Sequence, residues 1–277
     1  MIKAVLRKCA PQPLWVIAAA GKSWLLDAAD VVLGRRNEFV PPRRLTFVGG
    51  GKFMETGNEF LAHFKLLIDL KPDHCVLDVG CGIGRMAVPL TTYLSAEGAY
   101  DGFDIVPHGI AWCRENVTRR YPNFRFQLAD IRNLEYNPNG TITPGEYRFP
   151  YADGSFDAVL VTSVFTHMLP HDVAHYLSET TRVLKPGGRC LTTWFLLNEA
   201  SERLIERGRS ALDFRHDVEG CRTTNPAVPE WAIAYREDRV RALFDRAGLG
   251  LEHPVRYGSW CGRTDYLSFQ DICIARR

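Results

Sequence analysis

The sequence predicts an α/β fold built on a doubly wound, mostly parallel sheet. Strand-like and helix-like patterns alternate from about residue 55 onward, and this alternation is typical of a parallel sheet with helices on both faces. The first strand ends in a glycine turn, residues 80–84, which leads into a helical pattern. The chain has 277 residues, of which 46% are hydrophobic, so it is long enough for one sizeable core.

The elements of the first half follow in order. The letters "TGNE" have the form of a capping box, so we expect a helix with Thr56 as its N-cap and Glu59 three positions later. Pro72 ends this helix. Strand-like patterns predict five strands, at 75–79, 100–104, 124–129, 156–161 and 189–196. Helical patterns predict the connections at 83–94, 107–121 and 172–184, with Pro107 in a first turn.

The second half continues the same alternation. The letters "KPGG" at 185–188 predict a turn from helix to strand. Further helices are expected at 199–207 and 237–247, followed by two strand-like runs, the last within "YLSFQDICIA". The loops near 132–155 and 210–235 are longer than the sheet requires, and their aromatic residues favour ordered lids or substrate walls.

The N-terminal segment differs in charge from the rest of the chain. Residues 1–52 contain nine Lys or Arg and three Asp or Glu, although the whole chain carries only +2. We therefore expect a basic extension or lid at 1–52 and one domain at 53–277. The extension is either a solvated surface segment or a contact for anionic lipid or for a phosphate on the substrate.

Composition narrows the function classes. No apolar run is long enough to span a bilayer, and "LWVIAAAG" near the N-terminus is too short to favour a cleaved signal. The eight cysteines form no CxxC pair and the histidines are dispersed, so we expect no metal site and a reducing cytoplasm. Near-zero net charge argues against sequence-specific binding of nucleic acid. The sequence makes no prediction of the oligomeric state.

The glycine turn predicts a nucleotide-like cofactor, and its neighbours decide which one. Arg85 stands where a dinucleotide-binding turn has its third glycine, and Asp78 lies two residues before Gly80. A carboxylate there would repel a pyrophosphate but attract a cationic cofactor. S-adenosylmethionine carries a sulfonium and an ammonium group and has no phosphate, so it fits this pattern better than NAD.

Two further carboxylates end the next two strands. Asp104 ends the second strand, where a carboxylate can accept hydrogen bonds from both hydroxyls of a ribose. Asp130 ends the third strand, where it could meet an adenine amino group while Ile131 packs on the ring. Acidic residues at three successive strand ends, together with the glycine turn, form a specific pattern.

These motifs resemble those of the class I S-adenosylmethionine-dependent methyltransferases, in their small-molecule branch. The segments "VLDVGCGIGR", "GFDI", "LADI", "FDAVLVTSVFTHM" and "RVLKPGGRCLTTWF" carry the resemblance, which covers roughly residues 56–195. It implies a seven-stranded sheet whose antiparallel last strand inserts between the fifth and the sixth. It also implies S-adenosylmethionine as the cofactor, held by Phe53, Thr56, Asp78, Gly80, Cys81, Gly82, Asp104, Ile105, Asp130, Ile131, Thr162 and Ser163.

The catalytic prediction concerns histidine. His167 follows the fourth strand, where the sulfonium of the cofactor would lie, and His171 follows within reach. A histidine titrates near neutrality and suits a general base for a hydroxyl acceptor; the alternative is that His167 only caps a helix or lines the pocket. Five other residues are expected to line the substrate site: Trp194, Tyr235, Arg236, Trp260 and Arg263. Each aromatic residue among them is individually more typical of a hydrophobic core than of a site.

The predicted activity is therefore O-methylation of a small-molecule, glycan or lipid-linked acceptor. The motifs of base-amino methylation, of carbon-5 pyrimidine methylation and of metal-dependent catechol methylation are absent from the sequence. Alternatives are N-methylation of a small amine, RNA methylation, a NAD-dependent oxidoreductase, and a module that binds the cofactor without turnover.

Overall fold

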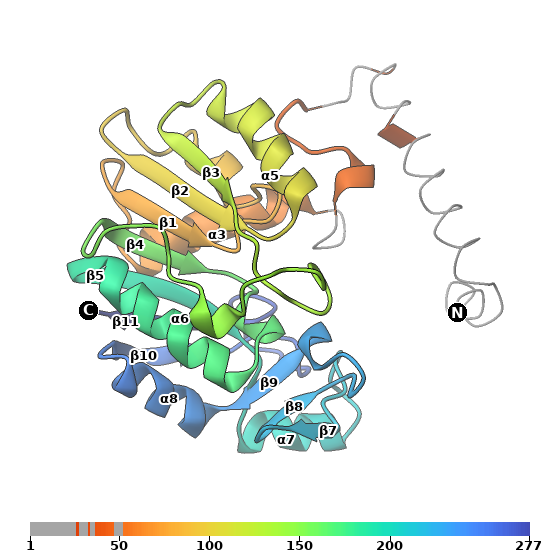
Figure 1. Ribbon diagram of the computed structural model, residues 1–277. Coiled ribbons are helices and arrows are strands. Elements are labelled where there is room, and N and C mark those ends of the chain that lie inside the picture. Colours follow the sequence, from red (N-terminus) through yellow and green to blue (C-terminus); the bar gives the residue numbers. More distant parts are fainter. Residues whose placement is uncertain (1–25, 28–32, 34–36, 47–51) are drawn as a thin grey trace.

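A computed structural model describes residues 26–27, 33, 37–46 and 52–277 of the chain. Its main sheet has seven strands in the order β10-β11-β5-β4-β1-β2-β3 (Figure 1). The strands are β1 (Cys75–Val79), β2 (Ala99–Asp104), β3 (Phe124–Leu128), β4 (Phe156–Val161), β5 (Leu184–Trp194), β10 (Gly250–Arg256) and β11 (Asp271–Arg276).

The directions of the strands confirm the predicted fold class. β1 pairs in parallel with β2 on one side and with β4 on the other. β11 lies between β5 and β10 and is antiparallel to both. The strand order reverses between β1 and β4, and in doubly wound sheets ligands bind at the carboxyl ends beside such a switch point.

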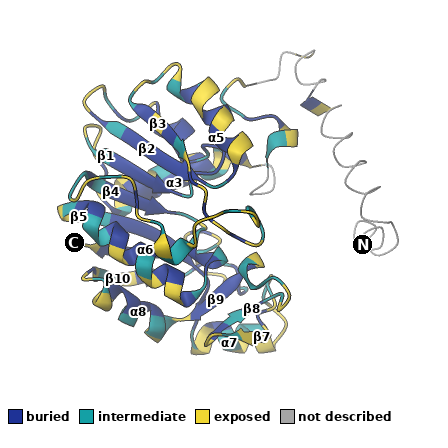
Figure 2. Ribbon diagram, viewed as in Figure 1, coloured by how far each residue is buried: buried dark blue, intermediate teal, exposed yellow. Residues whose placement is uncertain are grey.

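Two helical layers cover the sheet, as Figure 1 shows. One face carries α3 (Phe53–Leu67), α4 (Ala87–Leu90) and α5 (Pro107–Cys113), and the other carries α6 (Pro170–Val183) and α8 (Glu237–Arg246). Side chains of successive strand residues alternate between the faces, so Val76 packs with the first layer and Leu77 with the second. The strands and the inner sides of the helices form the buried interior in Figure 2.

The start of α3 corrects one prediction. The helix begins at Phe53 with Lys52 as its N-cap, so the predicted capping box at Thr56 is wrong. The N–H group of Thr56 donates to the Lys52 carbonyl at 3.0 Å, inside the helix. Phe53 is buried, with its ring 6.4 Å from that of Trp112, and this packing extends the helix by one turn beyond the polar signal.

Other boundaries also differ from the predicted ones. The helix expected at 83–94 is only the four residues of α4, preceded by turns. The helix expected at 107–121 divides into α5 and a π-helical turn, η2 (Arg114–Thr118). The predicted turn at 185–188 instead lies within β5, where the pairing with β4 shifts between Phe156↔Leu184 and Ala158↔Arg189.

The long segment at 210–235 is more regular than predicted. It contributes to a second sheet with the order β6-β9-β8-β7. Its strands are β6 (Leu196–Leu197), β7 (His216–Val218), β8 (Cys221–Thr223) and β9 (Ile233–Arg236), with α7 (Glu199–Glu206) beside them. The short helix η5 (Pro229–Trp231) precedes β9 and brings this segment to the site described below.

The N-terminal extension is described only in part. Within residues 37–46, Glu38 pairs with Arg120 at 2.7 Å, and the Phe39 and Tyr121 rings lie 6.1 Å apart. The predicted lid role and the boundary at residue 52 stay predictions, because most of residues 1–52 lie outside the described part. In the described chain, no helix has the length and apolarity needed to cross a membrane.

Candidate functional site

A cavity of about 480 Å³ opens at the carboxyl edge of β1, β2 and β4. The glycine turn, the end of β2 at 103–106 and the end of β4 at 162–164 form its floor and sides. Residues distant in sequence also line the wall, among them Lys52, Thr56, Glu59, Phe60, Pro144, Tyr176 and the segments 131–133 and 268–270. The volume lies in the range of small-molecule and cofactor sites.

The backbone of the glycine turn is bent so that its N–H groups are used within the protein. Gly80 and Gly82 have φ angles of 75° and 57°, which side chains with a Cβ rarely adopt. The N–H groups of Gly80 and Cys81 donate to the Phe103 carbonyl at 2.9 and 3.0 Å, and that of Gly82 donates to Asp104 at 2.8 Å. A dinucleotide-binding turn offers such groups to a pyrophosphate, so this turn disfavours NAD.

Asp104 is the central carboxylate of the cavity wall. One oxygen accepts from the N–H of Gly82 at 2.8 Å and the other from the N–H of Val106 at 2.8 Å. Burial raises the pKa of this carboxyl, while the N–H bonds oppose that rise. Each carboxylate oxygen can accept a further hydrogen bond, so Asp104 keeps free acceptor capacity at the wall, and its contact with a ribose stays a prediction. Ile105 lies beside it in the wall.

Asp78 lies beneath the wall and is not among the residues that line the cavity. The Tyr100 hydroxyl donates to its carboxylate at 2.5 Å, and the side chain is fully buried. Burial raises the pKa of Asp78 to about 7. The predicted direct contact with a cationic cofactor is therefore not formed by this arrangement, and any attraction would act through the turn.

The two residues predicted at the end of β3, Asp130 and Ile131, differ in whether they reach the cavity. Asp130 is exposed, accepts from the Thr141 hydroxyl at 2.5 Å and does not line the cavity. That hydrogen bond lowers the pKa of Asp130 and ties the loop at 132–155 to the strand. Ile131 is buried in the cavity wall. The structure thus brings Ile131 to the cavity and turns Asp130 away from it.

Polar residues of three neighbouring strand ends are linked at the end of β4. Ser163 has a positive φ of 60°, and its N–H donates to the Thr193 hydroxyl at 2.7 Å. Gln270 accepts from Thr193 at 2.6 Å and donates to the Ser163 hydroxyl at 3.0 Å. A strained residue held by such bonds is typical of functional sites. Thr162 and Ser163 both line the cavity.

Of the two residues predicted from α3, only Thr56 reaches the cavity. Thr56 and Cys81 are in its wall, whereas Phe53 packs in the core and does not line it. Glu59, from the next turn of α3, lines the cavity and accepts from the Ser268 hydroxyl at 2.6 Å. This bond joins α3 to the segment before β11.

The two predicted histidines differ in position. His167 lies in η4 (Phe165–His167), lines the cavity, and its Nδ1 is 2.8 Å from the backbone carbonyl of Glu230. Burial lowers the pKa of its imidazole. His171 lies outside the cavity wall with 65% of its side chain exposed, next to Asp172 at 3.1 Å. The structure therefore brings His167 to the cavity and not His171.

The predicted substrate walls in the C-terminal half are mostly core. Trp194, Tyr235 and Trp260 are fully buried and do not line the cavity. Arg236 is exposed, and Arg263 lies in a separate shallow pocket with Tyr257, at 4.5 Å from that ring. Large aromatic side chains in this segment are used for packing between the two sheets.

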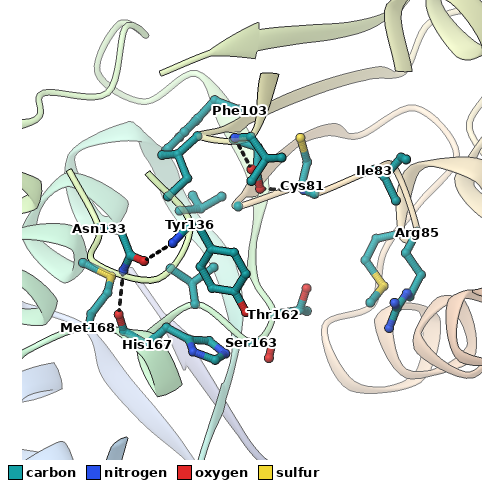
Figure 3. Close-up of a pocket in the computed structure, with 18 of the residues that line it drawn as sticks. Cys81, Ile83, Arg85, Phe103, Asn133, Tyr136, Thr162, Ser163, His167 and Met168 are labelled. Carbon is teal, nitrogen blue, oxygen red and sulfur yellow. Dashed lines mark hydrogen bonds between the residues drawn. The ribbon is translucent and has the colours of Figure 1, made fainter. Parts of the chain in front are cut away.

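The wall residues that the sequence analysis missed include Gln270 and, labelled in Figure 3, Asn133 and Tyr136. Asn133 begins the long loop at 132–155, and an asparagine at such a position signals a turn bonded to its side chain. No comparable signal marks Tyr136 or Gln270. Among the described residues, no group of three or more His, Cys, Asp or Glu is placed to hold a metal ion.

The model of a methyltransferase domain matches residues 77–192. The chain is 31% identical over 199 residues to the methyltransferase GfsG of Streptomyces halstedii, covering 71% of this chain and 60% of GfsG. It is 35% identical over 113 residues to the phthiotriol/phenolphthiotriol dimycocerosates methyltransferase of Mycobacterium tuberculosis, covering 41% of this chain and 34% of that protein. The chain thus spans less than two thirds of either relative.

Solved structures share the fold at low identity. A methyltransferase from Mesorhizobium loti, described as S-adenosylmethionine dependent, superposes with a TM-score of 0.57 at 16% identity, covering 81% of this chain and 100% of that chain. The PH0226 protein from Pyrococcus horikoshii gives a TM-score of 0.56 at 16% identity, covering 84% and 94% of the two chains.

The cavity wall fits S-adenosylmethionine as the cofactor. Asp104 keeps acceptor capacity at the wall, Ile105 and Ile131 offer apolar surface, and the N–H groups of Gly80, Cys81 and Gly82 are already used. Sequence motifs, sheet topology and the matched domain agree, and the chain contains a methyltransferase domain of the class I S-adenosylmethionine-dependent type.

Proposed function

We propose that this protein methylates a hydroxyl group of an apolar, lipid-linked or similar small acceptor. The observation that carries the proposal is His167, a partly buried histidine at the cavity wall whose Nδ1 faces a backbone carbonyl. Because a carbonyl only accepts, Nδ1 must donate, and in the neutral ring Nε2 is then the nitrogen that accepts a proton.

This arrangement suits a general base. Burial lowers the pKa of His167, so the ring is neutral at neutral pH and ready to take a proton from an acceptor hydroxyl. When bound, S-adenosylmethionine supplies a methyl group activated by its sulfonium. His167 would hold the acceptor oxygen in line with that group and receive the hydroxyl proton as the new bond to oxygen forms.

The wall beside His167 supports an apolar acceptor. The ring of Tyr136 lies 5.6 Å from that of His167, and Val164 and Met168 line the cavity on either side in sequence. None of these three side chains is charged. Phe269 lines the cavity while 49% exposed, so apolar surface continues from the wall to solvent. The mycobacterial relative is named as a methyltransferase of phthiotriol and phenolphthiotriol dimycocerosates.

The basic extension supports a second part of the proposal, a peripheral contact with anionic membrane. Residues 1–52 contain nine Lys or Arg and three Asp or Glu, and each basic residue near an anionic surface contributes about 1 kcal/mol of attraction. Such a contact would bring the cavity to a lipid-linked acceptor.

Transfer of labelled methyl groups tests the proposed acceptor. Purified protein is incubated with methyl-labelled S-adenosylmethionine and, separately, with hydroxystearate methyl ester, nonylphenol, glucose, dodecylamine or total RNA. We expect label in an apolar alcohol or phenol. Label confined to the amine, the sugar or RNA would contradict the proposal, and calorimetry showing tight binding of NAD without binding of S-adenosylhomocysteine would overturn the cofactor itself.

A further inference from the structure

We infer that Asn133 is the positioning residue of His167, an inference that rests on the proposed general-base function. Asn133 follows β3 at the start of the loop at 132–155, and only 8% of it is exposed. Its Nδ2 donates to the backbone carbonyl of His167 at 3.2 Å (Figure 3). A buried amide bonded to the main chain of the proposed base can fix where that base lies.

The other end of the same amide shapes the wall over the imidazole. Oδ1 of Asn133 accepts from the N–H groups of Glu135 and Tyr136, each at 3.0 Å. Two backbone donors identify this atom as the oxygen of the amide. The turn that they close carries Tyr136, whose ring meets that of His167 edge-on, at 5.6 Å and 85°. Asn133 thus holds both the main chain of His167 and its covering ring.

Asn133 also contacts Glu230, whose backbone carbonyl holds the imidazole of His167. Its Nδ2 lies 3.4 Å from Oε1 of Glu230, and the N–H of Leu134 lies 3.5 Å from the same oxygen. The backbone carbonyl of Glu230 accepts from Nδ1 of His167 at 2.8 Å. The two long loops therefore meet at Asn133, and together they clamp His167 between a side-chain amide and a main-chain carbonyl.

The chemical consequence is a fixed tautomer. A neutral imidazole carries one N–H, and the hydrogen bond of one nitrogen decides which nitrogen it is. With Glu230 in place the proton is on Nδ1 and Nε2 is the base. If loss of Asn133 lets the Glu230 turn move, the proton returns to Nε2, the form that histidine ordinarily favours in water. The ring would then have no acceptor at the nitrogen that must take the proton.

The test compares three variants by ¹⁵N NMR of His167 in protein saturated with S-adenosylhomocysteine. Asn133→Ala removes both functions of the amide. Asn133→Asp keeps an oxygen for the Glu135–Tyr136 turn but loses the donor to His167. Asn137→Ala is the matched control, because Asn137 donates to the Ile131 carbonyl at 3.0 Å in the same loop. Spectra at about pH 9, where the ring is neutral, separate tautomer from charge.

We expect wild type and Asn137→Ala to carry the His167 proton mainly on Nδ1, and both Asn133 variants to carry it mainly on Nε2. Turnover with any acceptor found should fall about tenfold or more in the Asn133 variants, with affinity for S-adenosylhomocysteine within twofold of wild type. If Asn133→Ala no longer binds that ligand, Asn133→Asp decides the question. A folded Asn133 variant with the wild-type tautomer would overturn the inference. Because the tautomer is read without turnover, failure of the proposed methyl transfer is a separate result.

Discussion

The two sides of the cavity are assembled in different ways. On the cofactor side, Asp104 bonds to Gly82, 22 residues earlier, and both lie at the ends of neighbouring strands. On the acceptor side, His167 bonds to Asn133, 34 residues earlier, and to Glu230, 63 residues later. The cofactor side is therefore a property of one strand-turn-helix unit and its neighbour, whereas the acceptor side exists only when two long loops dock.

Burial acts on both sides, with opposite effects on the pKa values. It raises the pKa of Asp78 and Asp104 and lowers that of His167, because a buried group favours its neutral form whether it is an acid or a base. The difference between the two sides thus lies in how they are assembled and in the type of residue that each presents.

The largest effect is expected on the acceptor side. His167→Ala should lower turnover by about a hundredfold or more and leave affinity for S-adenosylhomocysteine nearly intact. The wild-type rate should fall only below the usual histidine pKa of 6.5, because burial lowers the pKa of His167 and the protonated ring cannot accept a proton. Turnover against pH, with cofactor saturating, measures both.

The matched control for that variant is His171→Ala, since His171 is largely exposed and outside the wall. It should keep the wild-type rate and profile. Equal rates and profiles for wild type and His167→Ala would eliminate the general base and leave proximity as the source of catalysis.

The next effect concerns the cofactor side. Asp104→Ala removes the acceptor for ribose hydroxyls and the partner of the Gly82 N–H, so affinity for S-adenosylhomocysteine should fall by roughly 2–4 kcal/mol. Calorimetry measures it. Asp101→Ala is the control, because Asp101 is on the same strand but pairs with Arg125 at 2.6 Å. Similar affinities for the two variants would show that Asp104 does not hold the cofactor.

A smaller effect is expected on the pH dependence of stability, through Asp78, which is buried outside the cavity wall. Its pKa is about 7 in the folded protein against 3.8 as the ordinary value, so the folded state holds a proton that the unfolded state loses between these values. As the pH rises between these two values, Asp78 should lower the free energy of unfolding by about 1.4 kcal/mol for each pH unit. Asp78→Asn keeps an acceptor for Tyr100 and should abolish that slope in urea unfolding at several pH values. If the free energy of unfolding depends on pH in the same way in wild type and in Asp78→Asn, the raised pKa of Asp78 is contradicted.

Sequence alone was sufficient for the parts of the fold that local patterns determine. The strands β1 to β5 were found because each has a strand-like pattern within the alternation of strands and helices, and the antiparallel position of β11 followed from the family resemblance. The start of α3 was missed because a buried contact of Phe53 outweighs the polar signal at Thr56. The second sheet was missed because β7 and β8 are only three residues each.

The same limit applies to the site. The glycine turn, Asp104 and Ile105 lie within short motifs at strand ends, and their place in the cavity could be predicted. Asp130 could not be excluded in advance, because only the Thr141 hydroxyl of the following loop shows why it turns outward. Glu230 and Asn133 meet His167 across long stretches of chain, and no spacing in the sequence encodes that docking.

The smallest effect is expected from a third region, the basic segment at 1–52, and tests whether this segment contributes to the acceptor side. If the basic segment at 1–52 contacts anionic lipid, Lys8→Gln should lower partitioning onto phosphatidylglycerol vesicles by about fivefold, the equivalent of 1 kcal/mol per basic residue. Lys185→Gln is the control, because Lys185 is in the body of the domain and pairs with Asp157 at 2.7 Å. Co-sedimentation at low and at physiological salt measures both, and the difference should shrink with salt because the attraction is screened. Equal partitioning of wild type and the two variants would assign the charge of this segment to solvation and leave the apolar wall beside His167 as the sole determinant of the acceptor.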